Sequence, residues 1–206
     1  MARIAELHTL LQPKPVEPPA TTTQTFQGTL MQGQSGLGPG MTASNQLLPV
    51  AQTQSAGGAG TPAGQAIVNL VRNEIGVAEQ PPGSNDAPRI AQFRQATAGS
   101  GVGPWCAYFT SWAAREAGVP LGDAGQGFGR VDDVYAWAQR AGKAIPAGSG
   151  PPQPGDLIVW DEHIGVVESV LPDGGVQTIE GNSSDAVTRR THDASGGGAI
   201  GYVRLG

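Results

Sequence analysis

Cysteine, long apolar runs and positive charge are all scarce in this chain of 206 residues. It contains one cysteine, Cys106, so no disulfide can form within it, and cysteine usage indicates no particular redox compartment. No apolar run reaches the roughly 18 residues that a transmembrane segment needs. The formal net charge is −5, which argues against nucleic acid as a partner, because a basic patch would then be expected.

Aromatic residues are also few, at 5%, and they are unevenly placed. Phe26 is the only one before residue 90, and every tryptophan lies after residue 104. The intervening stretch is rich in Pro, Gln, Thr and Gly, which cannot supply an apolar core. We therefore expect a disordered linker over residues 13–62 and a folded domain over residues 63–206.

The first residues differ from the linker that follows them. Ile4, Leu7, Leu10 and Leu11 share one face of a helix, which predicts a short amphipathic segment over residues 1–12. This segment lacks the continuous apolar core and the small-residue cleavage site of a secretory signal. Any export would therefore follow a route other than a classical signal peptide.

Apolar spacing within the domain predicts helices first and strands afterwards. Helices are expected over 67–75, from 88 onward, over 104–117 and over 131–141. Short apolar runs predict strands over 156–160, 164–170, 176–180, 187–190 and 200–204, with a hairpin turn at 172–175. The fold class predicted is α+β, with N-terminal helices packed on a C-terminal antiparallel β-sheet.

Four polar residues stand at informative places in these elements. Cys106 lies in the first turn of a predicted helix, His163 opens an apolar strand, and Glu180 and Asn182 follow on the next strand. A helix N-terminus stabilises a thiolate, and an adjacent imidazole activates it when a third group orients the ring. The N–H groups of that helix end could also hold the oxyanion of a tetrahedral intermediate. This order is typical of a cysteine-nucleophile hydrolase.

The third member of this group stays open on physical grounds. Residues two apart on a straight strand share a face, so both Glu180 and Asn182 could reach the imidazole. A carboxylate would stabilise the imidazolium more strongly than an amide. His192 is the competing base, but it is expected in an exposed loop and is the poorer candidate.

The sequence predicts no metal site and no cofactor. Asp161, Glu162 and His163 are adjacent, so neighbours point to opposite faces of a strand, and no second histidine has ligand spacing. The oxygen-rich loop around Asp86 lacks calcium-loop spacing and predicts an Asx-turn.

Four segments in order resemble the CHAP-type amidohydrolase/peptidases. Pro104-Trp105-Cys106-Ala107-Tyr108-Phe109 is similar to their nucleophile segment, and residues 154–160 (PGDLIVW) to the strand before their histidine. Residues 163–167 (HIGVV) and 179–182 (IEGN) resemble their next two strands. The resemblance implies a papain-like fold, peptidoglycan as substrate, Cys106 as nucleophile, His163 as base, Glu180 as orienting acid and Asn182 as an auxiliary residue.

Two neighbours of the nucleophile are expected to contact substrate, namely Trp105 and Tyr108. Many members of that family have Gln immediately before the cysteine as an oxyanion donor, whereas this chain has Trp105. An indole N–H can donate one hydrogen bond, so Trp105 either supplies that donor or lines the groove.

The bond cleaved is open between the muramoyl–L-alanine amide and a peptide bond of the stem or bridge. An alternative is an NlpC-type endopeptidase, but that family commonly has Asp before the cysteine and His as the third residue. A non-catalytic cell-wall-binding or assembly module is a third reading. Residues 2–11 and the patch at 26–31 resemble the N-termini of peptidoglycan hydrolases associated with flagellar assembly, which implies an export or assembly partner and a place at the cell envelope.

Overall fold

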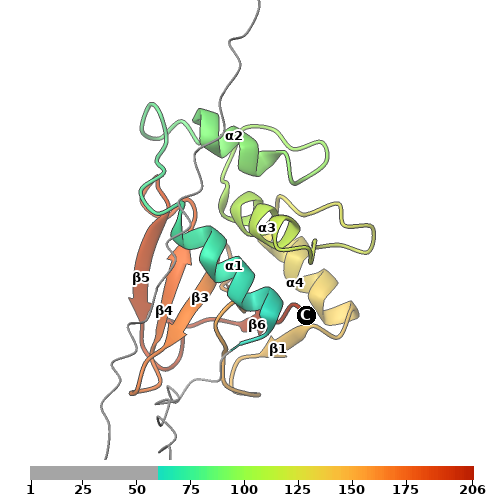
Figure 1. Cartoon of the computed structure of the whole chain (residues 1–206), viewed down its shortest axis with the longest axis vertical. Coiled ribbons are helices and arrows are strands. Elements are labelled where there is room, and N and C mark those ends of the chain that lie inside the picture. Colours follow the sequence, from blue (N-terminus) through green and yellow to red (C-terminus); the bar gives the residue numbers. More distant parts are fainter. Residues whose placement is uncertain (1–59) are drawn as a thin grey trace, which may run out of the picture. The chain divides into compact units, whose positions relative to one another are not determined.

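The computed structural model describes residues 60–206 (Figure 1). The predictions for residues 1–12 and for linker residues 13–59 lie outside the described part. The helices there are α1 (Pro62–Arg72), α2 (Pro88–Arg94), α3 (Cys106–Glu116) and α4 (Val131–Arg140). The strands are β1 (Ala144–Pro146), β2 (Leu157–Val159), β3 (Ile164–Val170), β4 (Val176–Glu180), β5 (Thr188–His192) and β6 (Gly201–Val203).

The strands form one antiparallel sheet in the order β1-β6-β2-β3-β4-β5. Helices α1 and α3 both contact β3, near the middle of that order (Figure 1). The predicted α+β class, with helices first and an antiparallel sheet last, is confirmed.

The start of α1 ties the two ends of the domain together. The Thr61 side chain accepts a hydrogen bond from Gly64 N at 2.9 Å, and Pro62 stands in the first turn, where its missing N–H costs nothing. The Thr61 hydroxyl also donates to the carbonyl of Leu205 at 2.8 Å. Thr61 and Pro62 therefore pack with the domain, although the expected domain start was residue 63.

A close approach between α1 and the turn before β2 depends on glycine. A Cβ on Gly155, where φ is +90°, would lie 2.1 Å from the Cα of Gly64. Neither residue can carry a side chain while the turn packs on the helix. The Pro-Gly-Asp segment thus fixes where β2 begins, and β2 leads directly to the turn that carries His163.

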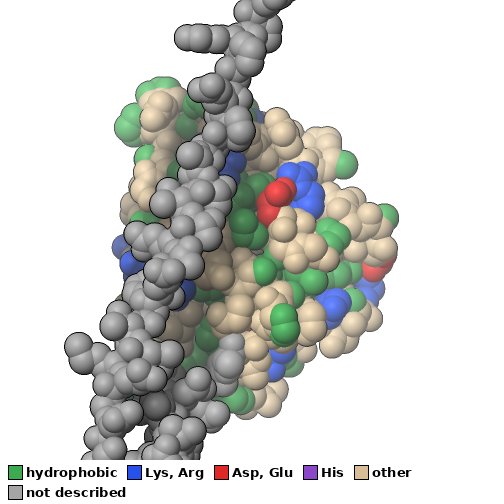
Figure 2. All heavy atoms as spheres, viewed as in Figure 1, with side chains coloured by type: hydrophobic (Ala, Val, Ile, Leu, Met, Phe, Trp, Pro, Cys, Tyr) green, Lys and Arg blue, Asp and Glu red, His purple; other side chains and the backbone are tan. Residues whose placement is uncertain are grey.

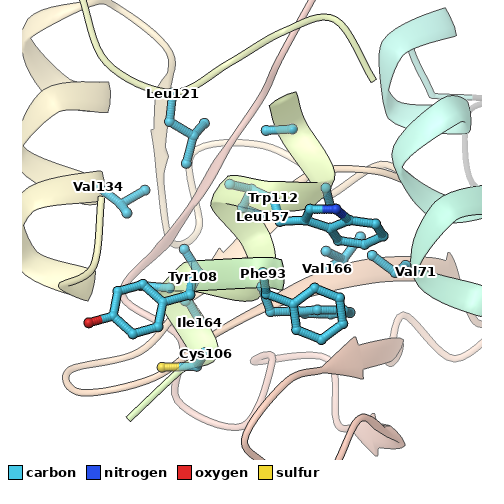
Figure 3. Close-up of a cluster of buried hydrophobic side chains, with 14 of the residues drawn as sticks. Val71, Phe93, Cys106, Tyr108, Trp112, Leu121, Val134, Leu157, Ile164 and Val166 are labelled. Atoms are coloured by element: carbon cyan, nitrogen blue, oxygen red, sulfur yellow. The ribbon is translucent and has the colours of Figure 1, made fainter. Parts of the chain in front are cut away.

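The helix that begins at Cys106 is the centre of the core. Its residues from Cys106 to Ala114 are all buried, and Phe109 packs edge-on against Phe93 with ring centroids 5.1 Å apart. Figure 3 shows this cluster, with the sulfur of Cys106 and the ring of Tyr108 pointing away from Phe93 and Trp112. The buried aromatic side chains anchor the helix, since each contributes about 1.5–3 kcal/mol on burial. The nucleophile candidate is therefore held on a rigid element.

Side chains alternate between the two faces of the sheet along each strand, and both faces carry apolar side chains. One face packs on the helices through Leu157, Val159, Ile164, Val166, Ile179 and Val203. The other carries a second cluster of Ile158, Val167, Val176, Ala199 and Tyr202. By the same alternation, Thr178 and Glu180 lie on the second face with Val176.

Several details differ from the sequence predictions. The strand expected over 187–190 runs from Thr188 to His192, so His192 ends a strand and the prediction of an exposed loop is wrong. The chain does not continue straight after β4, because β4 ends at Glu180 and Asn182 has φ of +58°. The expected helix over 104–117 begins at Cys106, and β1 was not predicted.

The surface of the domain is mixed in character. Figure 2 shows one face, on which hydrophobic side chains lie between polar ones and Lys and Arg stand in small separate groups. Within residues 60–206, none of the helices has both the length and the apolar character required to cross a membrane.

Candidate active site

Cys106 is the first residue of α3 and borders a cavity of about 500 Å³. Its side chain is nearly buried, with 5% of the residue exposed. The first N–H groups of an α-helix have no partner within the helix and carry partial positive charge. The sulfur therefore lies where a thiolate is stabilised and where backbone donors face the same space.

The cavity beside the thiol combines an aromatic wall with charged side chains. Tyr108 lines it, as do Arg130 and Asp132 at the start of α4. Asp161 and Glu162, in the turn before His163, complete the wall. An extended polar substrate could enter this space and place a carbonyl carbon next to the sulfur.

His163 connects the helix to the sheet. Its Nε2–H donates to Glu180 Oε2 at 2.9 Å, and the ring is also hydrogen-bonded to the Cys106 thiol. Because Nε2 is engaged by the carboxylate, Nδ1 is the nitrogen left for the thiol. Burial lowers the pKa of His163, but the hydrogen bonds with Cys106 and Glu180 outweigh it and raise that pKa to about 9. The ring is therefore protonated at neutral pH.

Glu180 is a buried carboxylate with three donors around it. Oε2 accepts from His163, while Oε1 accepts from Thr178 Oγ1 at 2.6 Å and from His192 Nε2 at 2.8 Å. Burial raises the pKa of Glu180, but the hydrogen bonds from these three donors outweigh burial and lower that pKa to about 2. The carboxylate is ionised throughout the physiological range and supports a positive charge on His163.

The carboxylate fits against β3 only because residue 165 is glycine. A Cβ on Gly165 would lie 2.7 Å from the Cγ of Glu180. Glycine in the His-Ile-Gly segment thus leaves room for the side chain that is hydrogen-bonded to the histidine.

The structure distinguishes Glu180 from Asn182 as the partner of the ring. Within the described residues, His163 Nε2 is bonded to Glu180, and Asn182 makes no hydrogen bond with the imidazole. The left-handed backbone at Asn182 turns the chain out of the strand, so the expected common face of residues 180 and 182 does not exist. An auxiliary role for Asn182 stays a prediction.

Trp105 is buried and does not contact the cavity, although it was expected to contact substrate. The residue has no exposed surface, and its indole Nε1–H donates to the buried carboxylate of Glu79 at 2.9 Å. An indole in that position neither lines the cavity nor serves as an oxyanion donor, so the prediction of substrate contact is wrong. Trp105 instead anchors the start of α3, next to Cys106, to the loop that follows α1. Tyr108, the other predicted contact, does line the cavity.

Two further residues lie at this site, Trp160, for which no role was predicted from the sequence, and His192, which was considered only as a competing base in an exposed loop. The Trp160 ring lies over His163 with centroids 5.5 Å apart and an interplanar angle of 29°. It also contacts the ring of His192, at 5.0 Å. The Trp160 position was visible in the PGDLIVW segment, whereas nothing local marked His192, whose partner Glu180 lies on another strand.

Within residues 60–206, no group of three or more His, Cys, Asp or Glu side chains is arranged to hold a metal ion. Asp86, from the oxygen-rich loop, is paired with Arg94 at 2.7 Å.

The profile of the CHAP domain matches residues 97–182, the segment that contains Cys106, His163, Glu180 and Asn182. Residues 97–182 therefore match the CHAP domain, and the resemblance noted in the sequence is confirmed. Among solved structures, the chain is similar to an N-acetylmuramoyl-L-alanine amidase from Staphylococcus aureus, with 18% identity and a TM-score of 0.40. That match covers 51% of this chain and 31% of the amidase, and a likeness so distant and partial carries no functional argument. Comparison with curated protein sequences gives no match.

Proposed function

We propose that this protein is a peptidoglycan hydrolase that cleaves an amide bond with Cys106 as nucleophile. The observation that carries the proposal is the chain of contacts Cys106–His163–Glu180 inside a CHAP domain, beside a cavity large enough for a peptide segment. A non-catalytic module would not need a thiol, an imidazole and a buried carboxylate joined in this order.

In the proposed reaction, His163 carries the proton and Cys106 attacks as the thiolate. The charge of Glu180 favours His163 in its protonated form, and the helix end favours the thiolate of Cys106. The thiolate attacks the amide carbonyl carbon, and the oxygen gains a negative charge that the N–H groups at the start of α3 can stabilise. Loss of one such donor in other hydrolases costs about 3–4 kcal/mol of barrier.

The tetrahedral intermediate then collapses and releases the amine. His163 gives its proton to the departing nitrogen, which leaves a thioester on Cys106 and a neutral ring. The ring next takes a proton from water as the water attacks the thioester. The carboxylic acid is released, and the thiolate and imidazolium form again.

Two bond classes fit this chemistry equally, the muramoyl–L-alanine amide and a peptide bond within the stem or bridge. Either substrate implies action at the bacterial cell envelope. The expected export or flagellar-assembly partner rests on residues outside the described part and stays a prediction.

The test uses purified peptidoglycan and the full chain. Hydrolysis should release new amino groups without new reducing sugar ends, and mass spectrometry of the soluble products should identify the bond. An amidase releases intact stem peptides with a free N-terminal alanine. Pretreatment with iodoacetamide should abolish the release, because Cys106 is the only cysteine. New reducing ends alone, or release that survives alkylation, would refute the proposal.

A further inference from the structure

We propose that His192 is a positioning residue of this site, one that holds Glu180 so that a single carboxylate oxygen faces His163. Its catalytic consequence rests on the function proposed above. The observation behind it is that one buried carboxylate is shared by two histidines that are distant in the chain, His163 just before β3 and His192 at the end of β5.

The hydrogen bonds divide unequally between the two oxygens of Glu180. Oε1 accepts from Thr178 and His192, and Oε2 accepts from His163 alone. With 3% of the residue exposed, water has little access to this carboxylate. Two donors on Oε1 therefore fix the rotation of the carboxylate, and the remaining oxygen is directed at the catalytic ring.

His192 is itself held by the segment that follows β5. The Trp160 ring packs against it, and the Trp160 indole donates to the carbonyl of Gly196 at 2.8 Å. A Cβ on Gly197 would come within 2.7 Å of His192 Nδ1, so this backbone packs closely on the ring. Asp193 stabilises the turn by accepting from Ser195 N at 2.9 Å. The second histidine is thus also held in place by its surroundings.

Few other charges face this pair of rings. Asp161 and Glu162 precede His163 and line the cavity, and Asp193 follows His192. Arg190, also on β5, donates to Ser183 and Ser184. Within the described residues, none of these four is hydrogen-bonded to Glu180, whose donors are Thr178 and the two histidines.

Positioning predicts a specific effect on the catalytic histidine. The hydrogen bond with Glu180 raises the pKa of His163. If His192 no longer holds Oε1, the carboxylate can rotate, this bond weakens, and the pKa of His163 falls. A role in stability alone would lower the free energy of unfolding and leave the pKa of His163 in the folded protein unchanged.

The experiment compares two substitutions that differ by one methylene group. In His192→Gln the amide nitrogen reaches about as far as Nε2 and can still donate to Oε1, whereas in His192→Asn it falls short. Thr191→Ala, at the exposed neighbouring position of β5, controls for changes to the strand. The pKa of His163 is measured by NMR in full chains with isotope-labelled histidine, and peptidoglycan hydrolysis is measured in parallel.

We expect His192→Asn to lower the pKa of His163 by about one unit, and kcat on peptidoglycan about tenfold, with KM little changed. His192→Gln and Thr191→Ala should stay within about threefold in kcat and keep the wild-type pKa. An unchanged pKa in His192→Asn would overturn the proposal, as would unfolding of that variant at neutral pH. A rise would show that His192 competes with His163 for the carboxylate, and it would overturn the proposal too. If the pKa falls as expected but the wild-type chain does not cleave peptidoglycan, positioning stands and the proposed function fails.

Discussion

Replacing Glu180 with glutamine keeps the size of the side chain and removes its charge, and the surrounding donors predict where the new amide will point. Two donors, Thr178 and His192, meet at Oε1 and one, His163, meets Oε2. The amide oxygen should therefore take the place of Oε1, and the amide nitrogen should face His163. The new amide N–H and the Nε2–H of His163 would then face each other as two donors, unless the ring proton moves from Nε2 to Nδ1.

That tautomer points a proton at Cys106, so the ring can no longer accept the proton of the thiol. Loss of the carboxylate in an analogous triad lowers turnover by up to ~10⁴-fold, largely through the wrong tautomer. We expect Glu180→Gln to lower kcat on purified peptidoglycan by ~10³- to 10⁴-fold. Asn182→Ala, at a residue with no hydrogen bond to the ring, should lower it by ~10-fold at most.

The assay measures soluble muropeptides released per minute from purified walls, with circular dichroism to confirm that each variant is folded. Iodoacetamide alkylation of Cys106 across pH 5–9 supplies a reading that needs no substrate. Glu180→Gln should lower alkylation at pH 6 more than Asn182→Ala does. If folded Glu180→Gln keeps activity within tenfold of wild type, or if Asn182→Ala causes the larger loss, Glu180 is not the residue that orients the ring.

Three further predictions concern the stability of the domain and its activity. Because the pKa of Glu180 is lowered to about 2 from 4.5, its contribution to stability is present above pH 4.5 and is lost as pH falls towards 2. Urea unfolding of the wild type should show a loss of about 3 kcal/mol in unfolding free energy over that range, which Glu180→Gln should lack. The same dependence of unfolding free energy on pH in both proteins would contradict this. A chain that starts at Gly60 should hydrolyse cell walls like the full chain. A chain that starts at Ala63 lacks the Thr61 cap and should lose about 1–2 kcal/mol in unfolding free energy. Equal stability of the two truncated chains would show that the cap is unimportant. Gly165→Ala places a Cβ 2.7 Å from the Cγ of Glu180 and should cost about 1–3 kcal/mol and at least ~10-fold in activity, and a fully active, stable variant would refute the close fit.

The three site residues that each carry a recognisable local pattern could be predicted from the sequence. A thiol in the first turn of an apolar helix, a histidine at the start of a strand and a carboxylate on the next strand each carry a local signal, and Cys106, His163 and Glu180 do meet. Choosing between Glu180 and Asn182 required the backbone, because a positive φ after the strand redirects residue 182.

Contacts whose partner carries no recognisable pattern of its own could not be predicted. Trp105 was expected at the substrate because it precedes the nucleophile, but its direction is set by Glu79, a buried carboxylate in a loop far earlier in the chain. His192 was expected in a loop because it lies between Thr191 and Asp193, shortly before a run of glycines. The pairing of β5 with β4 and the packing of Trp160 bring it to Glu180. The edge strand β5 contains no apolar residue, so no apolar pattern marks it in the sequence.

The proposed cysteine nucleophile is tested most directly by comparing wild type with Cys106→Ser on purified peptidoglycan. Serine keeps the shape of the side chain but lacks the thiolate that the helix end and His163 stabilise. We expect the release of new amino groups to fall by at least ~100-fold while circular dichroism and thermal unfolding stay close to wild type. Release within threefold of wild type by the folded variant would show that Cys106 is not the nucleophile.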